Sequence, residues 1–358
     1  MSKDMPSIKI PSRAIPLMGS IGRALTFLGP FLGLFFTIGL FAYLTRETQS
    51  FLTVDNWRMI SVQTVILVTA ALGMTMIMIS GGIDLSVGSV IALVCVVIAR
   101  LARGSDVQFP DFLGGAKFTL PAVPLTFALL IGVAIGMLCG LANGTLIAGL
   151  RVVPFIITLG SMKVYRGLAK WLSNSAPIYM PQEAQTWWFS MTLALEPSPR
   201  WLIVAPGVWM ALGLSVLIAL VLRYTLFGRH LYAVGSNEAT ARLCGIAVPG
   251  FKVSVYAAAG LLFGLAGVFQ FITLDGTGDP TTADGQELQV IAAVVIGGAS
   301  LSGGEGTILG SLIGCLIMSV LSNGCFLAGI PNAVRDIIIG GIIIAAVTLD
   351  RYRLSRIA

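Results

Sequence analysis

Apolar runs of about twenty residues recur along the whole chain, and they restrict its fold more than any other sequence feature. A helix that crosses the roughly 30 Å hydrocarbon core of a bilayer needs about 20 mostly apolar residues. Backbone groups in lipid must be hydrogen-bonded internally, so membrane-spanning segments form helices or a closed barrel. The runs lack the short alternating pattern of barrel strands. The sequence therefore predicts an all-α, polytopic transmembrane helical bundle.

We expect about ten spans, at residues 25–44, 58–79, 86–101, 122–148, 155–171, 202–222, 253–274, 287–300, 306–325 and 333–349. Several of these runs are shorter than twenty residues, which is typical of broken or re-entrant helices. The composition agrees, because 56% of the residues are hydrophobic and 11% are charged, whereas about a quarter are charged in soluble domains.

The distribution of charge predicts the orientation. An even number of spans places both termini on one side, and lysine and arginine favour cytoplasmic segments. The N-terminal segment 1–24, the loop 223–252 and the tail 351–358 are basic, whereas the loop 275–287 carries only acids. We therefore expect one transmembrane domain over 25–350, with cytoplasmic residues 1–24 and 351–358 and a cytoplasmic loop at 223–252.

Several functional classes lack the residues that they need. The chain has one histidine, five cysteines without a CxxC spacing, and no GxxxxGK[ST] phosphate-binding loop, so neither a zinc site nor ATP hydrolysis by this chain is expected. The net charge of +6 is scattered at the ends of apolar runs, which does not favour nucleic-acid binding. We expect no catalytic residues, no bound metal and no cofactor.

Two internal echoes interrupt the apolar runs. GGIDLSVG at 81–88 matches GGASLSGG at 297–304, and ANGTL around Asn143 resembles SNGCF around Asn323. Transporters are often built from duplicated halves, and glycine-interrupted segments in corresponding positions indicate the solute path. We therefore predict that Asp84, Ser86, Asn143 and Asn323 belong to a translocation path or gate.

Asp84 has two interpretations. An acid within a membrane span is costly and is a functional candidate by default. Alternatively, Asp84 or Ser86 caps the N-terminus of the next helix by accepting a free backbone N–H. The cap is the favoured local explanation, and a cap at a half-helix end can still border a polar path.

The segment GRHLYAVGSNEATARLCGIAVPG, residues 228–250, predicts a short helix on the cytoplasmic face. Ser236 or Asn237 suits the N-cap, and Glu238 suits the positive first turn. Glu238 and Arg242 are spaced i,i+4, and Gly245 suits the position after the last turn. From these residues alone, an ordinary loop helix is an equally good interpretation.

Five ordered motifs resemble a known family. They are GGIDLSVGS, VVPFIITLGSMKVYRGLA, GRHLYAVGSNEATARLCGIAV, VIGGASLSGGEGTILGSLIG and NAVRDIIIGGIIIAAVTLDRYR. Together, from about residue 51 to the tail, they resemble the membrane permease subunits of bacterial ABC importers of the ribose/xylose/arabinose/galactose type. The resemblance implies an ATPase-coupling helix formed by Ser236, Asn237, Glu238, Ala239, Arg242 and Gly245. The wider E-A-A-x3-G pattern is matched loosely, because Thr240 replaces the second alanine and Gly245 comes one residue late.

The resemblance implies a transmembrane subunit, in the bacterial cytoplasmic membrane, that translocates a monosaccharide or similar small polyol. Its partners would be a separate ATPase that uses ATP, a soluble extracytoplasmic sugar-binding protein, a second permease copy or close relative, and the lipid bilayer. Two alternatives remain open. One is an ABC permease for a nonsugar solute such as branched-chain amino acids. The other is an ion-coupled secondary transporter, which predicts coupling acids in several spans.

Overall fold

A computed structural model gives the fold and describes residues 18–47, 50–104, 106–108, 117–119, 121–184, 186, 189, 192–193 and 204–355. Each of the ten predicted apolar runs contains a helix. These helices are α1 (Met18–Leu44), α2 (Val54–Ile79), α3 (Val87–Arg103), α4 (Leu125–Leu150), α5 (Pro154–Ser173), α7 (Pro206–Tyr224), α10 (Val248–Thr273), α11 (Gln286–Ile296), α12 (Ile308–Leu327) and α13 (Asn332–Ser355). The predicted helical membrane bundle is confirmed.

The helices differ in their reach. By length and composition, α2, α4, α7, α10 and α12 can each cross a membrane. In contrast, α11 has 11 residues and α3 has 17, which gives lengths of about 16 Å and 26 Å at 1.5 Å per residue. Both are shorter than the hydrocarbon core, as expected for broken spans.

The remaining elements lie outside the long helices. They are α8 (Leu226–Ser236), α9 (Glu238–Leu243), the 3-10 helix η2 (Gln182–Ala184) and four short strands, β1 (Asp106–Gln108), β2 (Lys117–Thr119), β3 (Ile178–Tyr179) and β4 (Thr277–Gly278). The strands form two antiparallel pairs, β1 with β2 and β3 with β4. The β3–β4 pair joins the loop after α5 to the loop after α10, so these loops meet at one end of the bundle.

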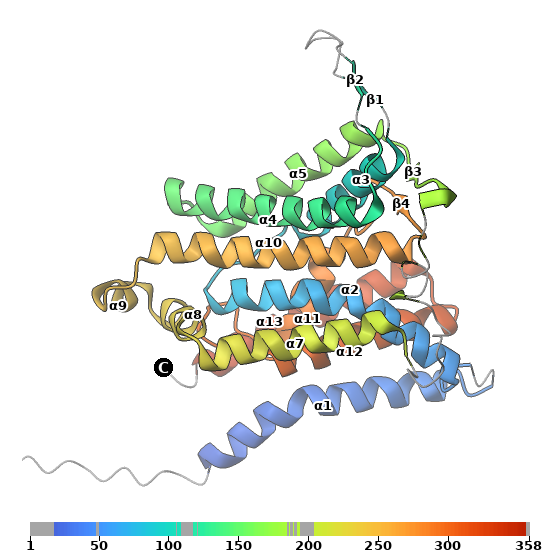
Figure 1. Ribbon diagram of the computed structural model, residues 1–358. Helices are drawn as coiled ribbons and strands as arrows, with labels where there is room; N and C mark the ends of the chain where they lie inside the picture. Colours follow the sequence, from blue (N-terminus) through green and yellow to red (C-terminus); the bar gives the residue numbers. More distant parts are fainter. Residues whose placement is uncertain are drawn as a thin grey trace, which may run out of the picture.

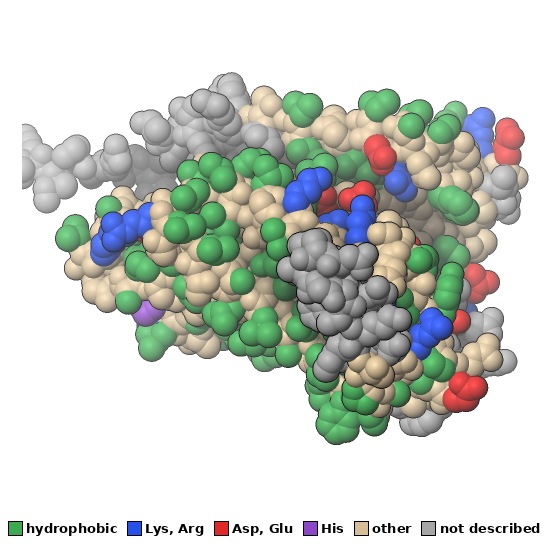
Figure 2. Space-filling view, turned by 90° about the horizontal axis from the view of Figure 1, so that it is seen from above, with side chains coloured by type: hydrophobic (Ala, Val, Ile, Leu, Met, Phe, Trp, Pro, Cys, Tyr) green, Lys and Arg blue, Asp and Glu red, His purple; other side chains and the backbone are tan. Residues whose placement is uncertain are grey.

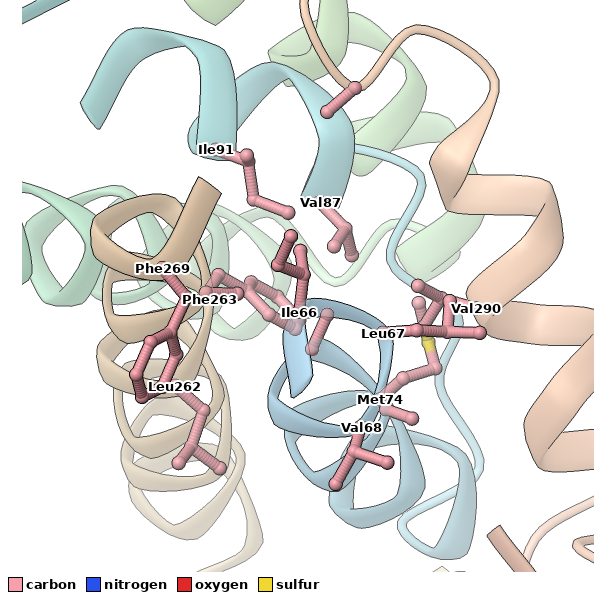
Figure 3. Packing of buried hydrophobic residues seen from close by; sticks show 14 of the residues in the cluster. Ile66, Leu67, Val68, Met74, Val87, Ile91, Leu262, Phe263, Phe269 and Val290 are labelled. Atoms are coloured by element: carbon pink, nitrogen blue, oxygen red, sulfur yellow. The ribbon is translucent and has the colours of Figure 1, made fainter. Parts of the chain in front are cut away.

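Helix α2 lies at the centre of the bundle. Most of its residues are buried, and it packs against α10, α12, α7 and α11. Figure 3 shows Ile66 and Leu67 of α2 surrounded by Val87 of α3, Phe263 of α10 and Val290 of α11. Since α2 is buried from Thr64 to its C-terminal end, the position of this part is determined by the packing of its neighbours.

The two ends of the bundle have different characters. The N-terminal end of α1, the helices α8 and α9, and the C-terminal end of α13 lie at one end, and both strand pairs lie at the other (Figure 1). Hydrophobic side chains cover much of the face seen in Figure 2, and the acidic side chains visible there gather toward one end.

Candidate functional site

Three of the predicted path residues converge in the non-helical segment between α2 and α3. The backbone N–H and the hydroxyl of Ser86 both donate to Oδ1 of Asp84, at 2.7 and 2.6 Å. The amide Nδ2 of Asn143, on α4, donates to Oδ2 of Asp84 at 3.3 Å and to Oγ of Ser86 at 2.9 Å. All three side chains are at most 1% exposed. They form a buried polar cluster, here called the Asp84 cluster.

Tyr165 of α5, which was not predicted as a path residue, extends the Asp84 cluster. Its hydroxyl lies 3.0 Å from Oδ1 of Asn143 and 3.0 Å from the carbonyl oxygen of Cys139. Nearby, the hydroxyl of Thr158 donates to the carbonyl oxygen of Ile83 at 3.2 Å. The cluster therefore fastens the break between α2 and α3 to α4 and α5.

The predicted helix cap at this break is wrong for Ser86, whereas the carboxylate of Asp84 does accept a backbone N–H, that of Ser86, at the start of α3. Ser86 occupies the N-cap position of α3, but its side chain makes no capping hydrogen bond. A capping residue normally has extended backbone angles, whereas Ser86 has helical ones, with φ −83° and ψ −4°. Its hydroxyl instead donates to Asp84, whose carboxylate accepts bonds from outside the first turn. Among the described residues, no group of three or more His, Cys, Asp and Glu side chains is placed so that it could hold a metal ion.

Replacing Asp84 with alanine should destabilise the protein, because the N–H and hydroxyl of Ser86 would lose their buried acceptor. Leaving buried donors unpaired costs about 1–3 kcal/mol. Thermal unfolding of the purified protein in detergent measures the effect. The matched control is Asp55→Ala, which removes a side chain that is 84% exposed and paired with Arg58 at the surface, and which should change stability by at most about 0.5 kcal/mol. Equal effects of the two substitutions would contradict a structural role for the Asp84 cluster.

Asn323, the fourth predicted path residue, lies apart from the Asp84 cluster. It lines a cavity of about 650 Å³, here called the central cavity, which none of Asp84, Ser86 and Asn143 lines. Helices α2, α10, α11, α12 and α13 contribute to its wall. The amide- and hydroxyl-bearing residues of this wall include Gln63, Gln270, Gln289, Ser319, Ser322 and Asn323. The structure thus divides the predicted path residues between a structural cluster and a cavity.

The two glycine-rich echoes meet in the structure. The N–H of Gly304, in the second echo, donates to the carbonyl oxygen of Ile79 at 2.8 Å, at the end of α2. Gly303 packs against the backbone of Gly81, in the first echo. The hydroxyl of Tyr232 on α8 also donates to the carbonyl oxygen of Gly306, at 2.8 Å. The two glycine-rich segments therefore form one junction next to α8.

The predicted short helix is present as α9. Asn237 is its N-cap, and its Oδ1 accepts the N–H of Thr240 at 2.9 Å. Glu238 and Arg242 form the predicted i,i+4 ion pair at 3.1 Å. Gly245 has φ +89° directly after the last turn, a conformation that favours glycine. Ser236 instead ends α8, so of the two predicted cap residues only Asn237 has that role.

Helix α9 is anchored on one side and free on the other. Ala241 packs against Val234 of α8 and Val248 of α10, while Leu243 is 89% exposed. Leu243 was not predicted to belong to the coupling segment, because an apolar residue in a short helix is usually expected to face inward. Its exposure leaves an apolar tip on the surface of α9.

A second ion pair orients α9 on the bundle. Lys252 Nζ lies 2.6 Å from Oε2 of Glu238. The hydrogen bond from Lys252 is the main reason that the pKa of Glu238 falls below its usual value, and Arg242 adds to the effect. A lowered pKa keeps the carboxylate charged until the pH drops through that lowered value. Both ion pairs of Glu238 are therefore present at neutral pH.

The comparisons with known proteins agree with this geometry. A sequence model described as "Branched-chain amino acid transport system / permease component" matches residues 56–347. The chain belongs to this permease family. Among the relatives, the ribose import permease protein RbsC of Escherichia coli (strain K12) is 36% identical over 320 residues, which cover 88% of this chain and 91% of the relative. The corresponding protein of Bacillus subtilis (strain 168) is 37% identical over 328 residues, covering 91% and 93%.

A third permease, the L-arabinose ABC transporter permease protein AraH of Azospirillum brasilense, is 33% identical over 318 residues, which cover 88% of this chain and 85% of the relative. No solved structure matches the chain. The family match includes the Asp84 cluster, the central cavity and α9, so these features lie within the part of the permease that defines the family.

Proposed function

We propose that this permease is the transmembrane subunit of an ABC importer for a monosaccharide or a similar small polyol. The observation that carries the proposal is the placement of α9, which is anchored to α8 and α10 while its apolar tip, Leu243, projects from the bundle. A separate ATPase that covers this tip would transmit the energy of ATP to the bundle. The solute class is supported by the names of the ribose and L-arabinose relatives.

Helix α8 connects α9 with the centre of the bundle. Gly235 lies so close to the end of α2 that a Cβ atom at this position would overlap the carbonyl oxygen of Ile79. The same glycine contacts the backbone at Gly303 and Gly304. A displacement of α9 therefore acts directly on the junction of the two echoes, which supports Ser236, Asn237, Glu238, Ala239, Arg242 and Gly245 as the ATPase-coupling segment.

The remaining partners follow from the two ends of the bundle. We place the end with α8, α9, the start of α1 and the C-terminus in the cytoplasm, because the loop 223–252 and the tail are basic. A soluble sugar-binding protein would then meet the end with the strand pairs. A second copy of the permease, or a close relative, would complete the assembly in the bacterial cytoplasmic membrane.

Uptake into vesicles tests the proposal. The permease is reconstituted with its ATPase and binding protein, and uptake of labelled ribose, xylose, galactose, a polyol and leucine is followed. Uptake of a sugar or polyol that requires ATP and survives collapse of ion gradients is the expected result. Uptake that follows an ion gradient and ignores ATP would instead identify a secondary transporter, and selective uptake of leucine would identify a permease for amino acids.

Replacing Glu238 with alanine should lower ATP-dependent uptake about tenfold, equivalent to roughly 1.4 kcal/mol of lost coupling. The carboxylate pairs with both Arg242 and Lys252, at 3.1 and 2.6 Å. Its loss therefore removes the ion pair that links α9 to Lys252 of α10. The amount of permease in the membrane should not change. The control is Glu183→Ala, which removes an exposed acid in η2. Uptake by the Glu238 variant equal to that of the control would count against α9 as the coupling element.

A further inference from the structure

Two buried amide oxygens in the wall of the central cavity have no hydrogen-bond partner. They are Oδ1 of Asn323 and Oε1 of Gln270, and their side chains are 4% and 8% exposed. The Nε2 of Gln270 donates to the hydroxyl of Thr282 at 3.1 Å. This hydrogen bond holds the amide in one orientation and leaves its oxygen without a donor among the described residues. Buried polar atoms in folded proteins are nearly always hydrogen-bonded. The two oxygens are therefore acceptors that lack a donor among the residues that the structure describes.

The rest of the wall is polar but carries no uncompensated charge. Its charged side chains are Asp284 and Arg335. Asp284 is 3.7 Å from Arg166, and Arg335 is 3.2 Å from Asp336. An amino acid would need free partners for its carboxylate and its ammonium group, because isolated charges are costly in a desolvated site. The cavity thus favours a neutral solute.

The apolar part of the wall has a complementary use. Met59, Ile66, Leu67, Met318 and Phe326 lie among the amides and hydroxyls. A small cyclic polyol presents both C–H surface and hydroxyl donors, so it matches a wall of this mixed kind. The volume of about 650 Å³ is within the range of about 300–1,000 Å³ that small-molecule sites have.

We propose that the central cavity of a single permease holds the solute during translocation, with Asn323 Oδ1 and Gln270 Oε1 accepting hydrogen bonds from its hydroxyl groups. This proposal rests on the proposed function. It adds the place where the neutral, polyhydroxylated solute binds and two residues that determine its specificity. Each acceptor contributes a neutral hydrogen bond of modest strength. A modest affinity suits a transport site, because the solute must also leave it.

The test uses the complete assembly in vesicles, at a saturating concentration of ribose-loaded binding protein. Asn323→Leu and Gln270→Met remove the amides with little change in side-chain size, and the control is Met137→Leu, at an exposed position of α4 outside the cavity. We expect each amide variant to import about tenfold less ribose per ATP hydrolysed, with ATP hydrolysis unchanged. The control should stay within about twofold of the original protein.

Single-deoxy riboses separate binding from a general structural effect. If an amide oxygen accepts a bond from one hydroxyl, removing that hydroxyl from the sugar should cost the unmodified permease more than it costs the corresponding variant. Equal proportional losses for every analogue in both variants would overturn the proposal. Import of ribose at the original rate by both variants would also overturn it while leaving the proposed function intact. Import of leucine instead of ribose by the unmodified assembly would overturn both.

Discussion

Replacing Gly140 with leucine is expected to prevent the permease from accumulating in the membrane. Gly140 lies on α4 where that helix meets α10, and a Cβ atom there would overlap the carbonyl oxygen of Tyr256 and lie 2.8 Å from Cα of Gly260. These are backbone atoms, so no side-chain rotation can relieve the clash. Membrane helices associate through close packing of small residues, and forced overpacking costs about 3 kcal/mol or more when the backbone must move. Quantitative immunoblotting of isolated membranes, followed by gel filtration in detergent, measures the loss.

The control for this substitution is on the same helix. Gly149→Leu introduces the same side chain at an exposed position where a Cβ atom meets nothing within 4 Å. The Gly149 variant should accumulate and elute as the original protein does. Normal accumulation of the Gly140 variant would mean that α4 and α10 can separate without cost, in contradiction to the structure.

Replacing Leu243 with aspartate is expected to weaken attachment of the ATPase strongly while leaving the permease folded. Leu243 is 89% exposed at the tip of α9, so the substitution removes no internal contact of importance. Burying a leucine side chain against a partner contributes about 2 kcal/mol, and burying an unpaired carboxylate in its place is costly. Together these effects should weaken the complex by at least about 30-fold. Titration of purified ATPase onto permease in lipid nanodiscs measures the affinity.

Two controls define the result. Leu243→Met keeps an apolar tip and should retain affinity within about threefold, because the two side chains are similar in volume. Tyr179→Asp places the same charge on an exposed aromatic residue at the opposite end of the bundle, and it should not affect the ATPase. Full binding by the Leu243→Asp variant would show that the ATPase docks elsewhere.

The elements whose signals are local were predictable from the sequence. The ten apolar runs correspond to helices because length and hydrophobicity decide whether a segment can lie in lipid. Helix α9 was predictable because its cap, its i,i+4 ion pair and its glycine stop lie within nine residues. The side of the membrane on which each terminus lies remains a prediction from charge.

The interactions that depend on tertiary contacts were not predictable in this way. The cap expected at Ser86 is absent because the Ser86 hydroxyl donates to Asp84 and accepts a hydrogen bond from Asn143 of α4. Asn143 and Asn323 lie in similar pentapeptides, yet one ties helices together and the other lines a cavity. Gln270 and Tyr165 were missed because a single polar residue in an apolar run does not reveal which helix it will face. An unusual polar residue at this depth was the only available signal.

The central position of α2 has a mechanical consequence. Gln63, in the wall of the central cavity, and Ile79, against Gly235, are sixteen residues apart on one continuous helix, a separation of about 24 Å. Because α7, α10, α11 and α12 pack around its middle, α2 can tilt as one rigid helix about that packed region. A tilt of about 5° over this length moves one end by roughly 2 Å relative to the other, which is enough to break a hydrogen bond. Movement of α8 against the C-terminal end of α2 would therefore shift Gln63 in the wall of the central cavity, while the contacts between the solute and α12 stay in place.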